Sequence, residues 1–212
     1  AIFDVKSGGQ LLVADDFSLD ASQIKQSGVS SNGIQLTKGT LAVDGTLTLT
    51  KAATVDLGKA DGTNILKAKT LDLQLENPTS GSTLQSGTFV VSEGLKTNSQ
   101  VGVVVGAKGK LQLNDDTGSS RTIYAKSVNV SGDTAALAVT KGTWTLTDLT
   151  LGTSGAASVS SGAGLNANTL TVGDANAHLD LAKGATSKIT SLTATAGKVN
   201  VADGARATIE QI

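Results

Sequence analysis

A short phrase recurs along this chain at a nearly constant spacing, and this repetition limits the folds that the chain can adopt. In each copy a branched apolar residue is followed by two variable residues, a glycine and a small residue. The four clearest copies begin at Val139, Val159, Leu181 and Val201, so one copy follows another after about 20 residues. A period of this length is typical of solenoids, in which each repeat buries its apolar face only against the next.

Apolar and polar residues alternate over short stretches of the chain, which indicates half-buried β-strands. The clearest of these stretches are Thr46–Thr50, Leu71–Leu75, Ser127–Val130, Thr143–Thr147 and Leu179–Leu181. No segment shows the apolar spacing of an amphipathic helix together with capping residues, so we expect almost no helix.

The repeats also align in detail. Leu179–Ile189 matches Val199–Ile209 one repeat later, and Leu170–Val172 matches Leu192–Ala194 in the same way. Each repeat therefore contains about three short strands separated by glycine-rich turns. The sequence predicts an all-β solenoid with coils of about 20–22 residues, stacked as parallel strands about 4.8 Å apart.

In such a stack the four residues that open the clearest copies lie on top of one another inside the column. Two earlier copies, at Leu36–Leu41 and Val91–Leu95, join this set, and the first of them precedes the Val139 copy by about five periods. We expect about ten coils in a single segment, residues 1–212, of a larger surface protein. Three stretches that break the period are predicted to be loops: 59–69, 76–85 and 114–121.

The composition excludes several classes of protein. The net charge is −1, with basic and acidic residues spread singly, so the chain offers no basic patch for nucleic acid. It contains no apolar run of about 20 residues, so we expect no membrane insertion of this segment. It also contains no cysteine, which excludes disulfides, thiolate metal sites and thiol catalysis, and which is typical of large exported bacterial proteins.

Three phrases resemble a known family: the Gly-Thr-Leu-x-Val-x-Gly-Thr-Leu-Thr-Leu phrase of Gly39–Leu49, the Leu-Thr-Val-Gly phrase at Leu170, and the Ala-x-Gly-Ala phrases near the C-terminus. They are similar to passenger domains of bacterial autotransporter and two-partner-secreted adhesins. This resemblance implies a right-handed parallel β-helix, export across the Gram-negative envelope, and adhesion or self-association in biofilms. It carries no catalytic motif.

The acidic residues offer one candidate metal site. Asn114, Asp115 and Asp116 are followed by Gly118, and their oxygens are of the kind that Ca²⁺ prefers. The pair Asp15–Asp16 is a second, weaker candidate. Neither stretch has the spacing of an EF-hand or of a calcium-binding β-roll, so we expect both to be solvated turns and predict no metal and no cofactor.

The lone histidine and a possible glycosylation sequon have simple structural interpretations. His178, the only histidine, is expected to face solvent beside a strand, because one histidine cannot build a metal site. The sequon at Asn129 is expected to carry no glycan.

Threonine pairs could form an ice-binding face only if they stacked in successive coils, but they recur at steps longer than the repeat, with gaps between them. The residue directly before the repeat glycine is a lysine in some copies and an acid in others. These residues are expected to line one edge of the stacked coils: Lys38, Lys141, Lys183, Glu93 and Asp203.

The sequence therefore favours a non-enzymatic adhesin or stalk segment on the surface of a Gram-negative bacterium. Its expected partners are a host or bacterial cell surface, a glycan, or another copy of itself. Two other classes remain open: a self-assembling surface-layer or matrix scaffold, and a glycan-active β-helix enzyme. A glycan-active enzyme needs clustered carboxylates and sugar-stacking aromatics, whereas here the acids are scattered and aromatic residues make up 2% of the chain.

Overall fold

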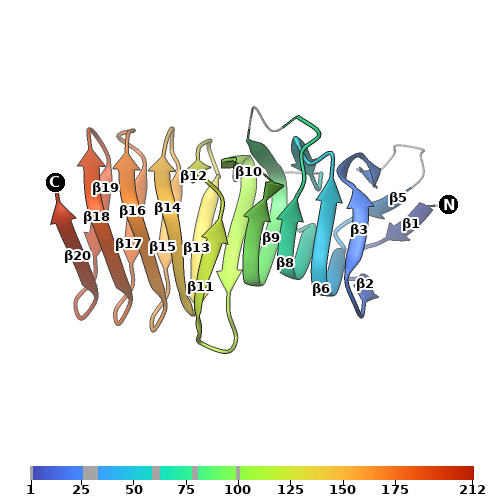
Figure 1. Cartoon of the computed structure of the whole chain (residues 1–212), viewed down its shortest axis with the longest axis horizontal. Helices are drawn as coiled ribbons and strands as arrows, with labels where there is room; N and C mark the ends of the chain where they lie inside the picture. Colours follow the sequence, from blue (N-terminus) through green and yellow to red (C-terminus); the bar gives the residue numbers. More distant parts are fainter. Residues whose placement is uncertain (1, 26–32, 59–62, 78–80, 99–100) are drawn as a thin grey trace.

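A computed structural model describes residues 2–25, 33–58, 63–77, 81–98 and 101–212. It confirms an all-β fold in which parallel strands are stacked into a β-solenoid of about seven turns. The termini lie at opposite ends of the column (Figure 1). Within the described ranges, helix is limited to the 3₁₀ turn η1 (Ala21–Gln23) and to Asn98, which is also in 3₁₀ conformation. No helix there is long and apolar enough to cross a membrane.

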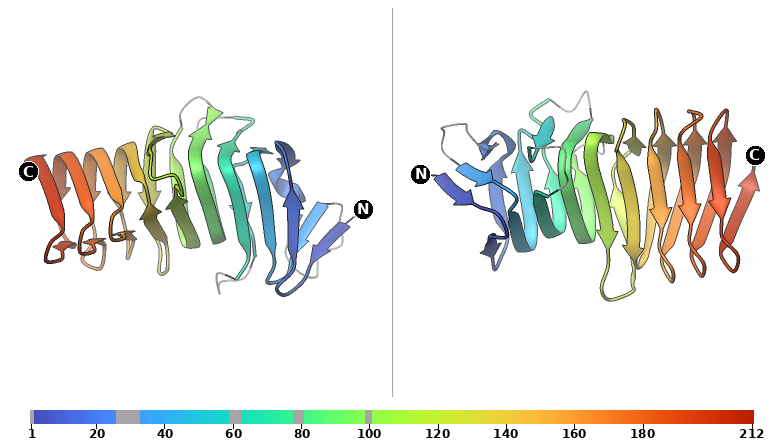
Figure 2. Two further views of the ribbon diagram at one scale, coloured as in Figure 1. Left: turned by 90° about the horizontal axis from the view of Figure 1, so that it is seen from below. Right: turned by 180° about the vertical axis from the view of Figure 1, so that it is seen from behind.

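Three parallel faces wrap around the column, and long strands bend from one face into the next (Figure 2). The first face contains β2 (Gln10–Val13), β6 (Thr40–Thr50), β8 (Ile65–Leu73), β9 (Ser82–Thr97), β10 (Val103–Asn114), β13 (Ala136–Lys141), β15 (Ala156–Val159), β17 (His178–Leu181) and β19 (Lys198–Val201).

The second face contains β3 (Phe17–Asp20), the later parts of β6, β8 and β9, then β11 (Ser120–Tyr124), the first halves of β14 (Thr143–Leu151), β16 (Gly164–Val172) and β18 (Thr186–Ala194), and β20 (Arg206–Gln211). The third face contains β7 (Thr54–Asp56), the first parts of β9 and β10, β12 (Ser127–Val130) and the second halves of β14, β16 and β18. A small sheet at the N-terminal end consists of β1 (Ile2–Val5), β5 (Gly33–Leu36) and β4 (Ile24–Lys25).

Inward side chains form continuous apolar columns. On the first face Val139 pairs with Val159, Val159 with Leu181, and Leu181 with Val201, as the repeat predicts. The first three are buried, while Val201 in the last coil is 47% exposed. Burying one such aliphatic side chain contributes about 1.5–3 kcal/mol. Each coil gains this contribution only from its neighbours, so the stack is stabilised one interface at a time.

One buried amide ties the N-terminal coils together. Asn64 is 4% exposed, and its Nδ2 donates to the carbonyl oxygens of Leu57 at 2.6 Å and Leu36 at 3.2 Å. Its Oδ1 accepts a hydrogen bond from the Gly39 amide at 3.2 Å. The side chain therefore satisfies main-chain groups of two coils at a corner where the strand ladder is interrupted.

The number and length of the coils differ from the prediction. The column has about seven turns, fewer than the ten expected, and its coils are not all of one length. Gln10 pairs with Thr40 and Thr40 with Ile65, so these early coils contain about 25–30 residues each. The next two steps, from Ile65 to Thr88 and from Thr88 to Lys110, contain 23 and 22 residues, and the step to Ala136 contains 26. From Ala136 onward every step on this face contains 20–22 residues, the length that the repeat predicts.

The copy at Leu36 is not aligned as the sequence suggests. Leu36 pairs with Val5 in the small N-terminal sheet, and the phrase leads from β5 into β6 on the first face. The Val139 phrase instead leads from the first face into the second. The prediction that these copies are stacked five periods apart is wrong, because the same short phrase serves two different corners. Val91, by contrast, does belong to the Val139 column through Leu113.

The three predicted loops are shorter than expected where the structure describes them. Strand β8 begins at Ile65 and β9 at Ser82, so the ends of 59–69 and 76–85 are strand. In 114–121, β10 ends at Asn114 and β11 begins at Ser120. These segments are rich in Gly, Ser, Asp, Asn and Thr, which favour turns, and this composition concealed the strand ends. Residues 59–62 and 78–80 lie outside the described residues.

Substituting Leu181 tests the register of the column. We expect Leu181→Asp to lower the unfolding free energy by about 3 kcal/mol or more, because it removes a buried aliphatic group and buries a carboxylate. Thermal unfolding followed by circular dichroism measures the effect. Thr208→Asp, at an exposed position, is the matched control. Equal unfolding temperatures for the two variants would contradict the assigned register.

Candidate functional site

The turn between β10 and β11 brings a buried carboxylate against a guanidinium. Asp115 is 1% exposed, and its Oδ1 accepts hydrogen bonds from the Thr117 amide at 3.0 Å and the Thr117 hydroxyl at 2.7 Å. Arg121 Nη2 also donates to this oxygen at 3.4 Å. Arg121 Nε lies 3.2 Å from Asp115 Oδ2 as an ion pair, although it is not aligned as a hydrogen bond.

Arg121 occupies a position that apolar residues fill in the next two coils. It pairs in register with Trp144, which pairs with Leu165. Trp144 is fully buried, and its indole Nε1 donates to the Lys141 carbonyl oxygen at 3.0 Å. The Asp115–Arg121 pair thus closes the inside of the column at the start of β11, which pairs first with β14 and then, from Ile123, with β9.

The other members of this turn are also paired within the protein. Lys141 Nζ donates to Asp116 Oδ1 at 2.8 Å, and Asn114 Nδ2 donates to the same oxygen at 3.2 Å. The Thr140 hydroxyl donates to Asn114 Oδ1 at 2.8 Å. These contacts fasten the turn to the neighbouring strand β13.

These pairings bear directly on the calcium candidates Asn114, Asp115 and Asp116. Both carboxylates already have a basic partner and the Asn114 carbonyl oxygen already accepts a hydroxyl, so the arrangement is that of a turn held by its own side chains. Over the described ranges no group of three or more His, Cys, Asp or Glu residues could hold a metal ion. At the other acidic pair, Asp15–Asp16, the Asp16 Oδ1 accepts a hydrogen bond from the Thr46 amide at 2.6 Å, which makes Asp16 a turn cap.

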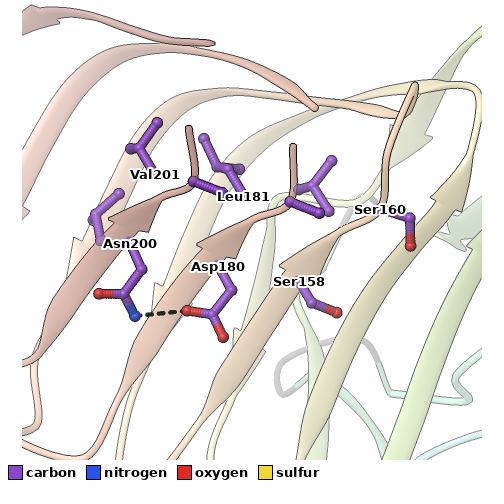
Figure 3. Close-up of a pocket in the computed structure, with 10 residues that line it drawn as sticks. Ser158, Ser160, Asp180, Leu181, Asn200 and Val201 are labelled. Carbon is purple, nitrogen blue, oxygen red and sulfur yellow. Dashed lines mark hydrogen bonds between the residues drawn. The ribbon is translucent and has the colours of Figure 1, made fainter. Parts of the chain in front are cut away.

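A shallow groove lies on the first face near the C-terminal end, with a volume of about 570 Å³. It crosses β15, β17 and β19, and its outward side chains form two rows. One row is polar and consists of Ser158, Asp180 and Asn200 (Figure 3). The other row is small and consists of Ser160, Ala182 and Ala202.

The polar row is held by contacts between coils. Asn200 Nδ2 donates to Asp180 Oδ1 at 2.7 Å (Figure 3), and His178 Nε2 lies 3.7 Å from Asp180 Oδ2. His178 is partly exposed at the start of β17, beside its strand as expected, and its Nδ1 is 3.1 Å from the Asn176 carbonyl oxygen. The sequence-based predictions missed this row, yet the alignment of successive repeats, which places Asp180 against Asn200, was a usable signal.

The threonine pairs fall on different faces. Thr143 and Thr145 lie on the second face, where they pair with Gly164 and Asn166. A column of Thr150, Thr171 and Thr193 does stack on the third face, one residue per coil, and the sequence did not predict it. The remaining pairs do not extend this column, so the face has no long threonine array within the described chain.

The expected lysine edge is only partly formed. Lys141, Lys183 and Asp203 each stand two residues beyond a member of the Val139 column. Lys38 does not join them, because it lies at the corner between β5 and β6.

At the sequon, Asn129 pairs in register with Thr150 on the third face, and its Oδ1 is buried.

Comparison of the chain with protein-family models, with curated protein sequences and with solved structures gives no match.

Removing one partner of the buried ion pair tests its structural role. We expect Asp115→Ala to lower the unfolding free energy by about 2–3 kcal/mol, because Arg121 is left without its counter-ion. Urea unfolding followed by the fluorescence of Trp144, the only tryptophan, measures this change. Asp116→Ala removes an exposed pair and should have little effect. Equal losses in both variants would show that the buried pair has no special role.

The carboxylates of Asp115 and Asp116 also determine how the stability of the fold depends on pH. Burial, the largest influence, raises the pKa of Asp115, but Thr117 and Arg121 together hold that pKa below its ordinary value of 3.8. Lys141, followed by Asn114, lowers the pKa of Asp116. Each group therefore binds fewer protons when folded than when unfolded. Its contribution is fully present above the unfolded pKa and is lost as the pH falls through the folded pKa.

We therefore expect the unfolding temperature to be level between about pH 7 and pH 5 and to fall below about pH 4. Asp115→Asn should make this fall shallower, because the substituted side chain no longer titrates. Differential scanning calorimetry across this range provides the measurement. An unfolding temperature that rises as the pH drops below about 4 would reverse the sign and contradict the assignment.

Proposed function

We propose that this chain is a rigid, non-enzymatic segment of a bacterial cell-surface adhesin or stalk, exported across a Gram-negative envelope. The observation that carries the proposal is the filled interior: aliphatic columns run through successive coils. Contacts with a partner therefore fall to the outer faces and turns of a long column, as adhesion or self-association requires. The resemblance of the Gly39–Leu49 phrase to autotransporter passenger domains supports the same class.

The composition of the groove favours binding over catalysis. Glycoside hydrolysis ordinarily uses two carboxyl groups on either side of the scissile bond. Among the residues that line the groove, Asp180 is the carboxylate, and it is engaged with Asn200. The groove residues fit a site that holds a partner without cleaving it.

Attachment of coated beads tests the proposal. Beads carrying the full polypeptide should attach to bacterial or epithelial cell layers, or cluster with one another, more than beads carrying Leu181→Asp. That variant controls for folding, since its column is expected to be opened. Absence of both attachment and clustering at high surface density would refute the proposal. Release of reducing ends from a polysaccharide would instead favour the glycan-active enzyme.

A further inference from the structure

The groove on the first face combines two kinds of surface in neighbouring rows. The polar row presents the Ser158 hydroxyl, the Asp180 carboxylate and the Asn200 amide, while the adjacent row presents mainly methyl groups. The main chain keeps the second row in register, because the Ala182 amide donates to the Val159 carbonyl oxygen at 3.0 Å and the Ala202 amide to that of Leu181 at 3.0 Å. Both rows are therefore fixed by the backbone ladder.

This combination suits a sugar chain. A pyranose ring has hydroxyl groups around its edge and C–H groups on its faces, so it needs hydrogen-bonding groups beside a small apolar surface. Binding sites of this kind place a few polar groups in a concave apolar setting. The small side chains of Ser160, Ala182 and Ala202 leave the hollow in which a ring can lie.

The charge of the groove favours a neutral ligand. Asp180 is its charged lining residue, and the Asn200 amide and the His178 ring lie against that carboxylate. At its edges Lys183 and Asp203 have opposite charges at equivalent positions of successive coils. A polyanion would meet the negative charge of Asp180, and a polycation would find one carboxylate that already accepts a hydrogen bond from Asn200.

The repeat of the groove sets the direction of the ligand. Ser158, Asp180 and Asn200 follow one another across three coils (Figure 3), at a spacing of about 4.8 Å per strand. A ligand that uses all three must run along the column and offer hydroxyl groups at intervals. A linear polysaccharide does so, whereas a single sugar reaches one coil or two.

We propose that the groove over β15, β17 and β19 binds a linear neutral polysaccharide lying along the column. This inference rests on the proposed adhesive function and names its ligand class. The lining contains no aromatic residue on which a sugar could stack, so a single groove binds weakly, with a dissociation constant of about 1 mM. Many copies on one surface convert this weak contact into firm attachment.

The test uses a matched pair of substitutions. Ala182→Glu fills the small row and places a second carboxylate in the groove, whereas Ala53→Glu makes the same change at an exposed alanine of the turn between β6 and β7, outside the groove. The probes are hexamers of β-1,4-linked glucose, α-1,4-linked glucose, β-1,4-linked mannose and β-1,4-linked N-acetylglucosamine, with oligomeric alginate as the polyanion. Chemical-shift titration of the full chain measures binding and locates it.

We expect at least one neutral hexamer to shift the signals of Asp180 and Asn200. Its affinity should fall at least tenfold in Ala182→Glu and stay within twofold in Ala53→Glu. The proposal is overturned if no neutral hexamer binds, if alginate binds better, or if both variants bind alike. It is also overturned if Ala182→Glu changes the sedimentation of the chain, since the groove would then be a contact between copies. Beads that still attach while hexamers fail to bind would refute the glycan site and leave the adhesive function standing.

Discussion

The hydrogen-bonded stacking of one coil on the next is the constraint on which the rest of this structure depends. The parallel ladders fix which residues lie above one another, and the alternation of strand side chains then decides which of them face inward. Val159 and Leu181 are buried because the main chain aligns them, and Ser158 and Asp180 face outward for the same reason. The apolar core and the outer surface are thus two results of one register.

This dependence explains how much the sequence could predict. From Ala136 onward the coils have nearly equal lengths, so the offsets between repeats were enough to assign the columns. Nearer the N-terminus the corners vary in length, and the longer step from Gln10 to Thr40 cannot be read from the period of the later coils. The phrase at Leu36 misled for a related reason, since a glycine turn looks alike at every corner.

The candidate sites show the same division. The alignment of Asp180 with Asn200 was present in the sequence, because both lie in regular coils and differ by one repeat. The pairing of Asp115 with Arg121 was not, because it depends on how a turn folds over the inside of the column. Asn64 was equally hidden, since its partners are main-chain groups at Leu57 and Leu36, in separate parts of the chain.

The shared register of the last coils has a consequence for how such a protein changes over generations. Because Val139, Val159, Leu181 and Val201 occupy equivalent places, an insertion or deletion of one complete coil joins surfaces that already match. Recombination between the repeats can therefore lengthen or shorten the molecule in whole units without opening its interior. The length of the column is then adjustable by copy number, while each coil keeps the chemistry of its outer faces.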